Sequence, residues 1–197
     1  MNTVIKVFTI FWKALLVVLL LIQLSACSLF SAQKSEKTAP TKTDKSLIDD
    51  AQLRKQLKAE RIVVEKSKRL MTVYALNKPI ATYKVAIGRE PLGPKTCEGD
   101  LRTPEGIYSV TEHRSKSRFY RALQFSYPNS SDIQRAKKQG CKPGHNLSIH
   151  GLGPERATAG KAHYTVDWTD GCIAVTDREM DELWKMVIKS TLIEIKP

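Results

Sequence analysis

Residues 61–87, RIVVEKSKRLMTVYALNKPIATYKVAI, contain three apolar runs separated by two polar breaks. β-branched and aromatic side chains are frequent in the runs, which cover residues 62–64, 70–76 and 80–87. Ser67-Lys68 and Asn77-Lys78-Pro79 interrupt them where hairpin turns are expected. This stretch therefore predicts three consecutive strands joined by short turns.

The same pattern continues toward the C-terminus. Further apolar runs predict strands at residues 107–111, 122–126, 147–150, 171–175 and 192–195. A helix is predicted from Ser130/Ser131 to Gln139, because Gly140 is a suitable C-cap. A second helix opens at the capping box Thr176-Asp-Arg-Glu179. The predicted fold class is therefore mostly β (α+β), with a few short helices.

The composition fits one ordinary domain with a hydrophobic core. The chain has 197 residues, of which 42% are apolar and 26% charged, which excludes global disorder and a multi-span membrane protein. We expect the folded domain to span residues 61–197 and a short leading helix to cover residues 47–60. Residues 27–46 are rich in Ser, Thr and Lys and predict a flexible tether.

The N-terminal segment has the features of an export signal. Lys6 and Lys13 flank the start of an apolar run at residues 14–22. As a helix this run covers only about 13 Å, which is too short for a bilayer core of roughly 30 Å. Residues 1–26 therefore predict a signal peptide, with an uncleaved anchor as the alternative.

Leu24-Ser25-Ala26-Cys27 resembles the bacterial lipobox, in which the cysteine is lipidated and becomes the new N-terminus. Acyl chains on Cys27 would anchor the protein stably, and Ser28 after it suggests the outer membrane, facing the periplasm. The alternative is an ordinary cleavage site followed by a chance cysteine. The net charge of +12 then favours anionic wall polymer or lipid headgroups over nucleic acid as partners, although charge alone assigns no function.

Three cysteines remain once Cys27 is set aside. Cys97 and Cys141 lie in the polar loops TCEGD and QGCKPGH, which makes them the natural disulfide pair in an oxidising compartment. Cys172 is left over, within Thr169-Asp-Gly-Cys-Ile-Ala-Val-Thr176 at the join of a strand and a capped helix.

That position suits a nucleophile, because a helix N-terminus favours a thiolate and Gly171 lets a substrate carbonyl approach the backbone. Backbone N–H groups around Gly171 and Cys172 are candidates for an oxyanion hole. His150 is the candidate base, because it ends an apolar strand and is expected at a sheet edge. Taken singly, each has a structural alternative: a small buried cysteine and a satisfied core histidine.

Residues 61–197 resemble the YkuD-type L,D-transpeptidase catalytic domain. His150-Gly151 followed by Thr169-x-Gly171-Cys172 is similar to its signature, HG and then [S/T]-x-G-C. Glu98-Gly-Asp-x-Arg-Thr-Pro-Glu-Gly106 looks like the family's GD-x-[KR]-TP-x-G segment. Tyr127-Pro-Asn129 and Pro143-Gly144 also match its exported branches. The resemblance implies a β-sandwich-like fold of mixed sheets with a Cys–His active site.

By this resemblance Cys172 is the nucleophile and His150 the general base, oriented by a backbone carbonyl, while Thr169 shapes the turn. The implied substrates are peptidoglycan stem peptides, and no cofactor is implied. The thiolate would attack the carbonyl between L-Lys or meso-diaminopimelate and a terminal D-residue, and an amine or water would then take the acyl group. Weaker candidates for substrate contact are Gly151, Tyr127, Trp168 and Arg118.

Two residues depart from the family pattern: Asp170 and Ala174 stand where many members have His and Arg. The missing Arg removes a contact to a substrate carboxylate, and Arg102, Arg118, Arg121 and Arg156 are candidates to replace it. An amide hydrolase of the same fold, including one that releases wall-attached lipoproteins, and a non-catalytic wall-binding lipoprotein therefore stay open.

Two other readings find little support. A sortase-like enzyme would need an essential arginine near the end of the catalytic strand, and none follows Arg178. No metal site is predicted, because Cys172, His150 and His163 lack zinc-ligand spacing.

Overall fold

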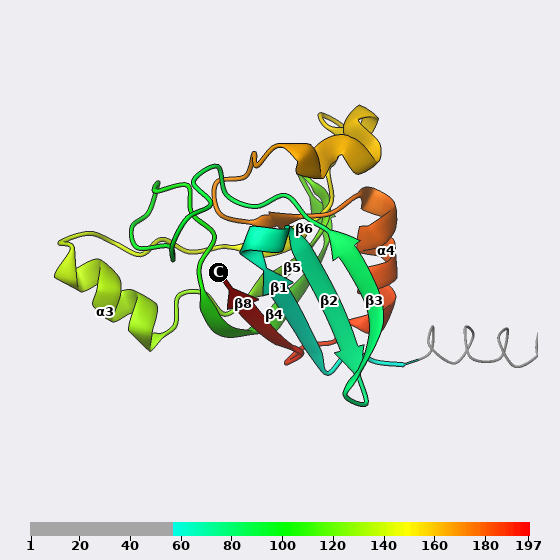
Figure 1. Cartoon of the computed structure of the whole chain (residues 1–197), viewed down its shortest axis with the longest axis horizontal. Helices are drawn as coiled ribbons and strands as arrows, with labels where there is room; N and C mark the ends of the chain where they lie inside the picture. Colours follow the sequence, from blue (N-terminus) through cyan, green and yellow to red (C-terminus); the bar gives the residue numbers. More distant parts are fainter. Residues whose placement is uncertain (1–56) are drawn as a thin grey trace, which may run out of the picture. The chain divides into compact units, whose positions relative to one another are not determined.

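The computed structural model describes residues 57–197, which form a mostly β domain (Figure 1). Its eight strands, all at predicted positions, are β1 (Arg61–Glu65), β2 (Leu70–Ala75), β3 (Lys78–Lys84), β4 (Gly106–Ser117), β5 (Tyr120–Phe125), β6 (Ser148–His150), β7 (Ile173–Ala174) and β8 (Leu192–Lys196). The helices are α3 (Ser130–Lys138) and α4 (Asp177–Met186), with short 3-10 segments η1 (Lys66–Lys68) and η2 (Ala157–Thr165). The predicted fold class is confirmed.

Several predicted N-terminal segments cannot be compared with the structure, which describes the chain from residue 57 onward. The signal peptide, the tether, Cys27 and residues 47–56 of the leading helix lie outside the described residues. Residues 57–60, the end of that predicted helix, run into β1 without helical structure. η2 was not predicted, because its sequence ATAGKAHYT has no amphipathic period.

The strands form one mixed sheet in the order β3-β2-β1-β8-β4-β5-β6-β7. β4 joins its two halves, because residues 106–109 pair with β8 and the rest of the strand pairs with β5. β1 and β8 run parallel, as do β6 and β7, and the other neighbours are antiparallel.

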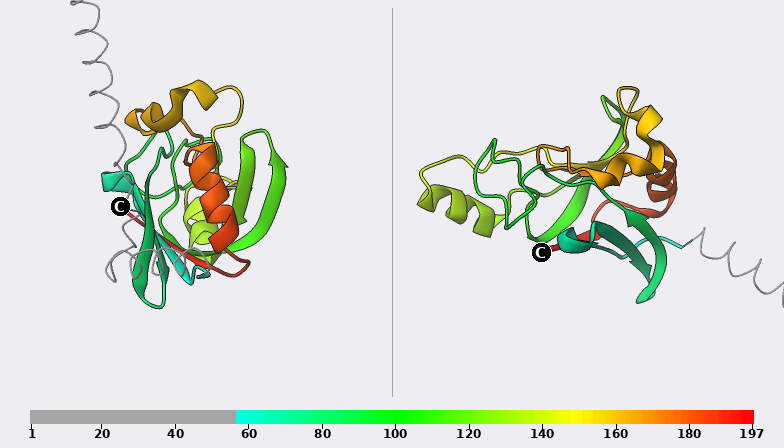
Figure 2. Two further views of the ribbon diagram at one scale, coloured as in Figure 1. Left: turned by 90° about the vertical axis from the view of Figure 1, so that its right-hand side faces the viewer. Right: turned by 45° about the horizontal axis from the view of Figure 1, so that its top comes forward.

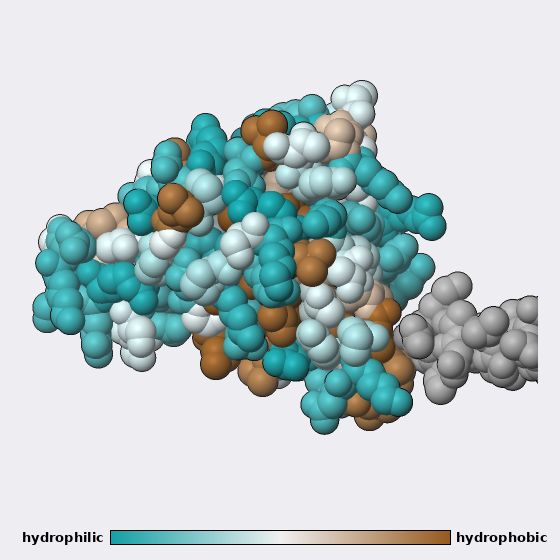
Figure 3. All heavy atoms as spheres, viewed as in Figure 1, coloured by the Kyte–Doolittle hydropathy of each residue, from teal (hydrophilic) through white to brown (hydrophobic). Residues whose placement is uncertain are grey.

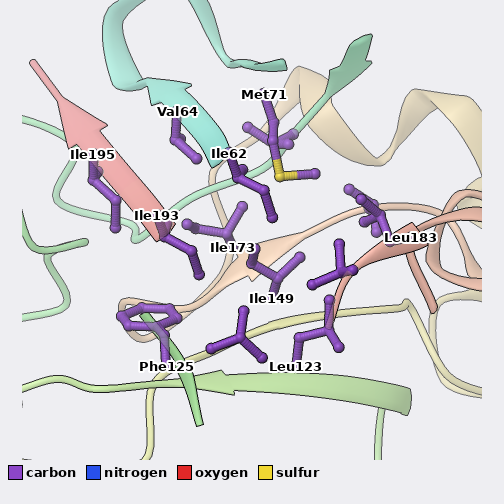
Figure 4. Close-up of a cluster of buried hydrophobic side chains, with 14 of the residues drawn as sticks. Ile62, Val64, Met71, Leu123, Phe125, Ile149, Ile173, Leu183, Ile193 and Ile195 are labelled. Carbon is purple, nitrogen blue, oxygen red and sulfur yellow. The ribbon is translucent and has the colours of Figure 1, made fainter. Parts of the chain in front are cut away.

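The hydrophobic core lies between the two halves of this sheet (Figure 4). Apolar side chains of β1 and β8 point toward those of β5, β6 and β7, and the labelled members include Ile62, Val64, Ile193, Ile195, Leu123, Phe125, Ile149 and Ile173. Alternate residues of each strand face this core, so the intervening residues of β6 and β7 face away from it.

The two helices lie at different places in the domain. α4 packs beside β5 and buries Met180 and Leu183, and its predicted capping box is present, with Thr176 and Glu179 exchanging hydrogen bonds (Figure 2). α3 projects from the end of the domain opposite β2 and β3 (Figure 1). The face of the molecule seen in Figure 3 is largely hydrophilic, with scattered apolar side chains. Leu92 and Ile107 are among the exposed large apolar residues. Within residues 57–197, no helix has the length and apolar character needed to cross a membrane.

Candidate active site

The neighbouring strands β6 and β7 bring the predicted nucleophile and base onto one face. Ile149 pairs with Ile173 and His150 with Ala174, so Ser148 and Cys172 are the preceding neighbours. Because Ile149 and Ile173 belong to the core, Ser148, His150 and Cys172 project from the opposite face. His150 is the last residue of β6, at the end of a strand as predicted, and it pairs with Ala122 of β5 on its other side.

The turn before Cys172 is held by Thr169 and Gly171. The Thr169 hydroxyl donates to Cys172 O over 2.6 Å and accepts from Gly171 N–H over 3.2 Å. Gly171 has φ +124°, and a Cβ there would lie 2.6 Å from Arg102 O. Thr169 therefore shapes the turn. The Gly171 N–H, predicted for an oxyanion hole, is already used by Thr169, so the Cys172 N–H remains as the nearby candidate.

The Cys172 thiol opens onto a cavity of about 330 Å³. Its lining comes mainly from two loops and consists of Lys95, Glu98, Gly99, Leu101, Gly144, His145, Asn146, Leu147, Asp170 and Cys172. The Ser148 hydroxyl lies 3.8 Å from Cys172 Sγ, a contact that motif analysis missed because only alternation along β6 points to it.

The expected effect of a helix N-terminus on the thiol is wrong. β7 separates Cys172 from α4, which begins at Asp177. Burial raises the pKa of the Cys172 thiol; hydrogen bonds from Ser148 lower it in part, and the charge of Asp170 raises it again. The free thiol is therefore mostly protonated at neutral pH.

The His150 imidazole is buried, with 2% of its surface exposed. Its Nδ1 lies 2.6 Å from Gly151 O, and because a carbonyl only accepts, Nδ1 carries the proton. Burial lowers the pKa of His150 to about 4, so the ring is neutral at pH 7 and Nε2 is its unprotonated nitrogen. This arrangement suits a general base.

An aromatic cover, made of Phe119 and Trp168, lies over His150. Phe119 stacks on the imidazole at 4.4 Å between ring centroids, and Trp168 meets it edge-on at 5.8 Å. The Arg156 guanidinium lies 4.3 Å from the Trp168 ring centroid. Arg118 lies over Phe119 and pairs with Glu155 at 3.1 Å. Trp168 thus contacts His150 directly, whereas Arg118 and Arg156 lie one layer further out, over Phe119 and Trp168; their contact with substrate stays a prediction.

The glycine-rich loop after His150 is fixed by Asp177. Its Oδ1 accepts hydrogen bonds from Leu152 N–H at 2.7 Å and Gly153 N–H at 3.2 Å. A Cβ at Gly151 would lie 2.4 Å from the same oxygen. Gly151, a candidate for substrate contact, is therefore accounted for by close packing. In the sequence Asp177 belongs only to the capping box of a predicted helix, and nothing there indicates its hydrogen bonds to the 151–153 loop.

The segment around Asp100 builds the other wall of the cavity. Asp100 accepts hydrogen bonds from the N–H groups of Thr96 at 2.6 Å, Cys97 at 3.0 Å and Arg102 at 3.1 Å. The two loop cysteines predicted to pair, Cys97 and Cys141, form a disulfide with a Cα–Cα distance of 5.7 Å. It ties the loop of Glu98 to the loop that leads to β6, and both loops line the cavity.

Tyr127 does not line the site. It is buried in the core, and its hydroxyl donates to Pro143 O over 2.8 Å. Burial raises the pKa of the Tyr127 phenol above its ordinary value. The prediction that Tyr127 contacts substrate is therefore corrected to a role in anchoring the loop before β6.

Asp170 and Ala174, which depart from the family pattern, differ in exposure and in their contacts. Asp170 is exposed and pairs with Arg89. Ala174 is fully buried, and its backbone exchanges hydrogen bonds of 2.8 and 3.1 Å with Ala86. Of the candidate replacements for the missing arginine, Arg121 pairs with Asp181 at 2.8 Å. Within residues 57–197, no group of three or more His, Cys, Asp or Glu side chains is arranged to hold a metal ion.

A sheet that places a neutral histidine and a cysteine on one face, with the cysteine lining a polar cavity, defines a cysteine–histidine type of site. The chain belongs to the YkuD family of L,D-transpeptidase catalytic domains, whose model matches residues 59–195. It is 32% identical over 109 residues to the "Putative L,D-transpeptidase YafK" of Escherichia coli K12, covering 54% of this chain and 36% of that protein. The chain thus spans about a third of that curated relative.

Solved structures show the same fold. The helical cell shape determining protein Pgp2 from Campylobacter jejuni matches with 22% identity and a TM-score of 0.54, over 76% of this chain and 55% of that one. Bd1075 of Bdellovibrio bacteriovorus matches with 23% identity and a TM-score of 0.50, over 71% of this chain and 48% of that one. The family acts on peptidoglycan stem peptides, which places this chain in a peptidoglycan-related group.

Proposed function

We propose that this protein is a cysteine acyltransferase acting on peptidoglycan stem peptides, with Cys172 as nucleophile and His150 as general base. The observation that carries the proposal is the His150 Nδ1 hydrogen bond to Gly151 O, which leaves Nε2 to accept a proton on the face shared with Cys172. The register of β6 and β7 puts this ring on the same face as Cys172, which lines a cavity, and this favours a catalytic base over a histidine kept only for packing.

The first half-reaction forms a thioester. His150 Nε2 removes the thiol proton as Cys172 Sγ attacks the carbonyl that joins L-Lys or meso-diaminopimelate to the terminal D-residue. The tetrahedral oxyanion takes the Cys172 N–H as a candidate donor. The C–N bond then breaks, the leaving amine receives the proton from His150, and the D-residue departs.

In the second half-reaction His150 Nε2 takes a proton from an acceptor as the acceptor attacks the thioester carbonyl; the C–S bond breaks and the proton returns to the Cys172 thiolate. An amine from another stem peptide or a free D-residue gives a cross-link or an exchanged residue, whereas water gives hydrolysis. Since Ala174 leaves no arginine at the position that contacts a substrate carboxylate in many members, hydrolysis of a wall amide is the second candidate function. That amide includes one joining a lipoprotein to the wall.

We also propose that the protein is exported and lipid-anchored at Cys27, facing the periplasm from the outer membrane. The support is the Leu24-Ser25-Ala26-Cys27 motif after a short apolar run. Cys27→Ala is expected to abolish acylation and release the protein from membranes, as measured by fractionation. Unchanged fractionation of Cys27→Ala would point to an uncleaved anchor.

The catalytic proposal is tested with the full chain and defined muropeptides, with products identified by mass spectrometry. Wild type is compared with Cys172→Ala, His150→Gln and His113→Gln. His113 is a matched control, because its Nε2 contacts Val187 O outside the site. New cross-links or exchanged residues that vanish only in the first two variants support transpeptidation. Cleavage without joining assigns a hydrolase. If no product depends on Cys172, a wall-binding lipoprotein becomes the better account.

A further inference from the structure

We propose that Ser148 is a positioning residue for Cys172: its hydroxyl donates a hydrogen bond to the sulfur as the thiolate forms. The inference rests on the proposed function of Cys172 and deepens it. The Ser148 hydroxyl lies 3.8 Å from Cys172 Sγ, within reach of a sulfur hydrogen bond. The role follows from strand register, since Ser148 directly precedes the β6 residue that pairs with Ile173.

The thiol needs such a donor because its other surroundings do not favour charge. Burial raises the pKa of Cys172, and the nearby carboxylate of Asp170 raises it further, while the Lys95 ammonium lowers it. Lys95 is engaged by Asp100 at 2.6 Å and by Cys97 O at 3.1 Å, so its charge is shared. Glu98 and His145 are the other ionisable groups that line the cavity.

The hydroxyl can serve both protonation states of the sulfur. It accepts from the thiol S–H in the resting protein and turns to donate to the thiolate after His150 has taken the proton. The Ser148 proton stays on its oxygen throughout, so the step adds no proton transfer of its own. A hydrogen bond to a charged acceptor is stronger than one to its neutral form, and the interaction therefore favours the reactive state.

The test measures the thiol itself and needs no wall substrate. Full-length wild type, Ser148→Ala, Ser148→Thr and Ser67→Ala are alkylated with iodoacetamide from pH 6 to pH 10.5, and modification of the peptide that contains Cys172 is followed by mass spectrometry. Ser67 is the control, because its hydroxyl donates to Pro197 O on an exposed turn. A thermal melt of each variant checks that it is folded.

We expect Ser148→Ala to shift the alkylation profile to higher pH and to slow the reaction about fivefold at pH 8. Ser148→Thr, which keeps the hydroxyl, should follow wild type. An unshifted profile in Ser148→Ala, or an equal shift in the Ala and Thr variants, would overturn the proposal. If Ser148→Ala does not fold, Ser148→Gly is measured against the same two outcomes. The alkylation experiment uses no muropeptide. Its result therefore supports or overturns the role of Ser148 even if the acyltransferase proposal fails.

Discussion

Cys172 and His150 project from one face of neighbouring strands, yet their surroundings differ. The thiol side is a polar cavity walled by loops that a disulfide ties together. The imidazole side is closed off, with His150 buried beneath Phe119 and Trp168. The proposed function uses this difference: the cavity at the thiol is where substrate would bind, and burial on the other side keeps His150 neutral and oriented.

Both groups are consequently uncharged in the resting protein. Burial raises the pKa of the Cys172 thiol and lowers that of His150 to about 4. A thiolate–imidazolium ion pair would require the opposite shifts. The resting site therefore holds no thiolate, and in the proposed mechanism proton transfer to His150 accompanies attack on the substrate.

The largest expected effect on stability comes from the disulfide that joins the two loops on the thiol side. Replacing Cys97 and Cys141 together by Ala removes a bridge across 44 residues, and we expect the free energy of unfolding to fall by about 4 kcal/mol. Denaturant unfolding measures the loss. The ionisation of His150, followed by NMR, should not change, since the bridged loops line the thiol cavity. A shifted His150 titration would show that the two sides are coupled.

The turn that carries the thiol should tolerate no side chain at Gly171. Gly171→Ala places a Cβ 2.6 Å from Arg102 O at φ +124°, and we expect destabilisation of about 3 kcal/mol. Gly140→Ala is a matched control, because Gly140 also has positive φ but no atom within 4 Å of a Cβ. That variant should lose only about 1 kcal/mol. Equal losses in denaturant unfolding would mean that the contact with Arg102 is unimportant.

The imidazole side should make stability depend on pH. The pKa of His150 falls from 6.5 to about 4 on folding, so between these values the unfolded chain binds a proton that the folded protein does not. The free energy of unfolding must therefore decrease as pH falls through this window. We expect wild type to lose about 2 kcal/mol more than His150→Gln between pH 7 and pH 5. Parallel curves for the two proteins would contradict a buried neutral imidazole.

The aromatic cover should be the source of that pKa shift, with a smaller effect on stability. Phe119→Ala opens the stacked face of the imidazole to water, and we expect the pKa of His150 to rise toward its ordinary value. Stability should fall by about 1 kcal/mol. Phe119→Leu keeps an apolar cover and should keep the low pKa. NMR titration of the His150 ring protons reads both variants, and an unchanged pKa in Phe119→Ala would assign the burial to other neighbours.

The fold was predictable because its signals are local. Hydrophobic runs and turn residues place all eight strands, and capping residues such as Thr176 and Gly140 locate the helix ends. Local signals do not determine which way a side chain faces. Tyr127 was therefore misassigned, because its position in a motif does not tell whether it faces the core or a cavity. The aromatic cover was only partly visible, since Phe119 and Trp168 are distant in sequence and meet only through folding.

The chemical environment of the site was the least predictable part. Closeness of Cys172 to a helix in sequence suggested a low thiol pKa, whereas β7 separates the two in space. Ser148 and Asp177 carry no motif of their own, and their contacts depend on strand register and on the path of the 151–153 loop. Ionisation and hydrogen bonding follow from such three-dimensional contacts.

The most direct test of the account is to trap the acyl-enzyme. The full chain is mixed with a muropeptide that carries a tetrapeptide stem and is quenched in acid, and the modified peptide is identified by mass spectrometry. The account predicts a thioester on Cys172 whose added mass equals the mass of the muropeptide minus that of the released free D-amino acid. Adduct formation should be slowed strongly in His150→Gln. Turnover of the muropeptide that persists in Cys172→Ala, or an adduct on another residue, would contradict it.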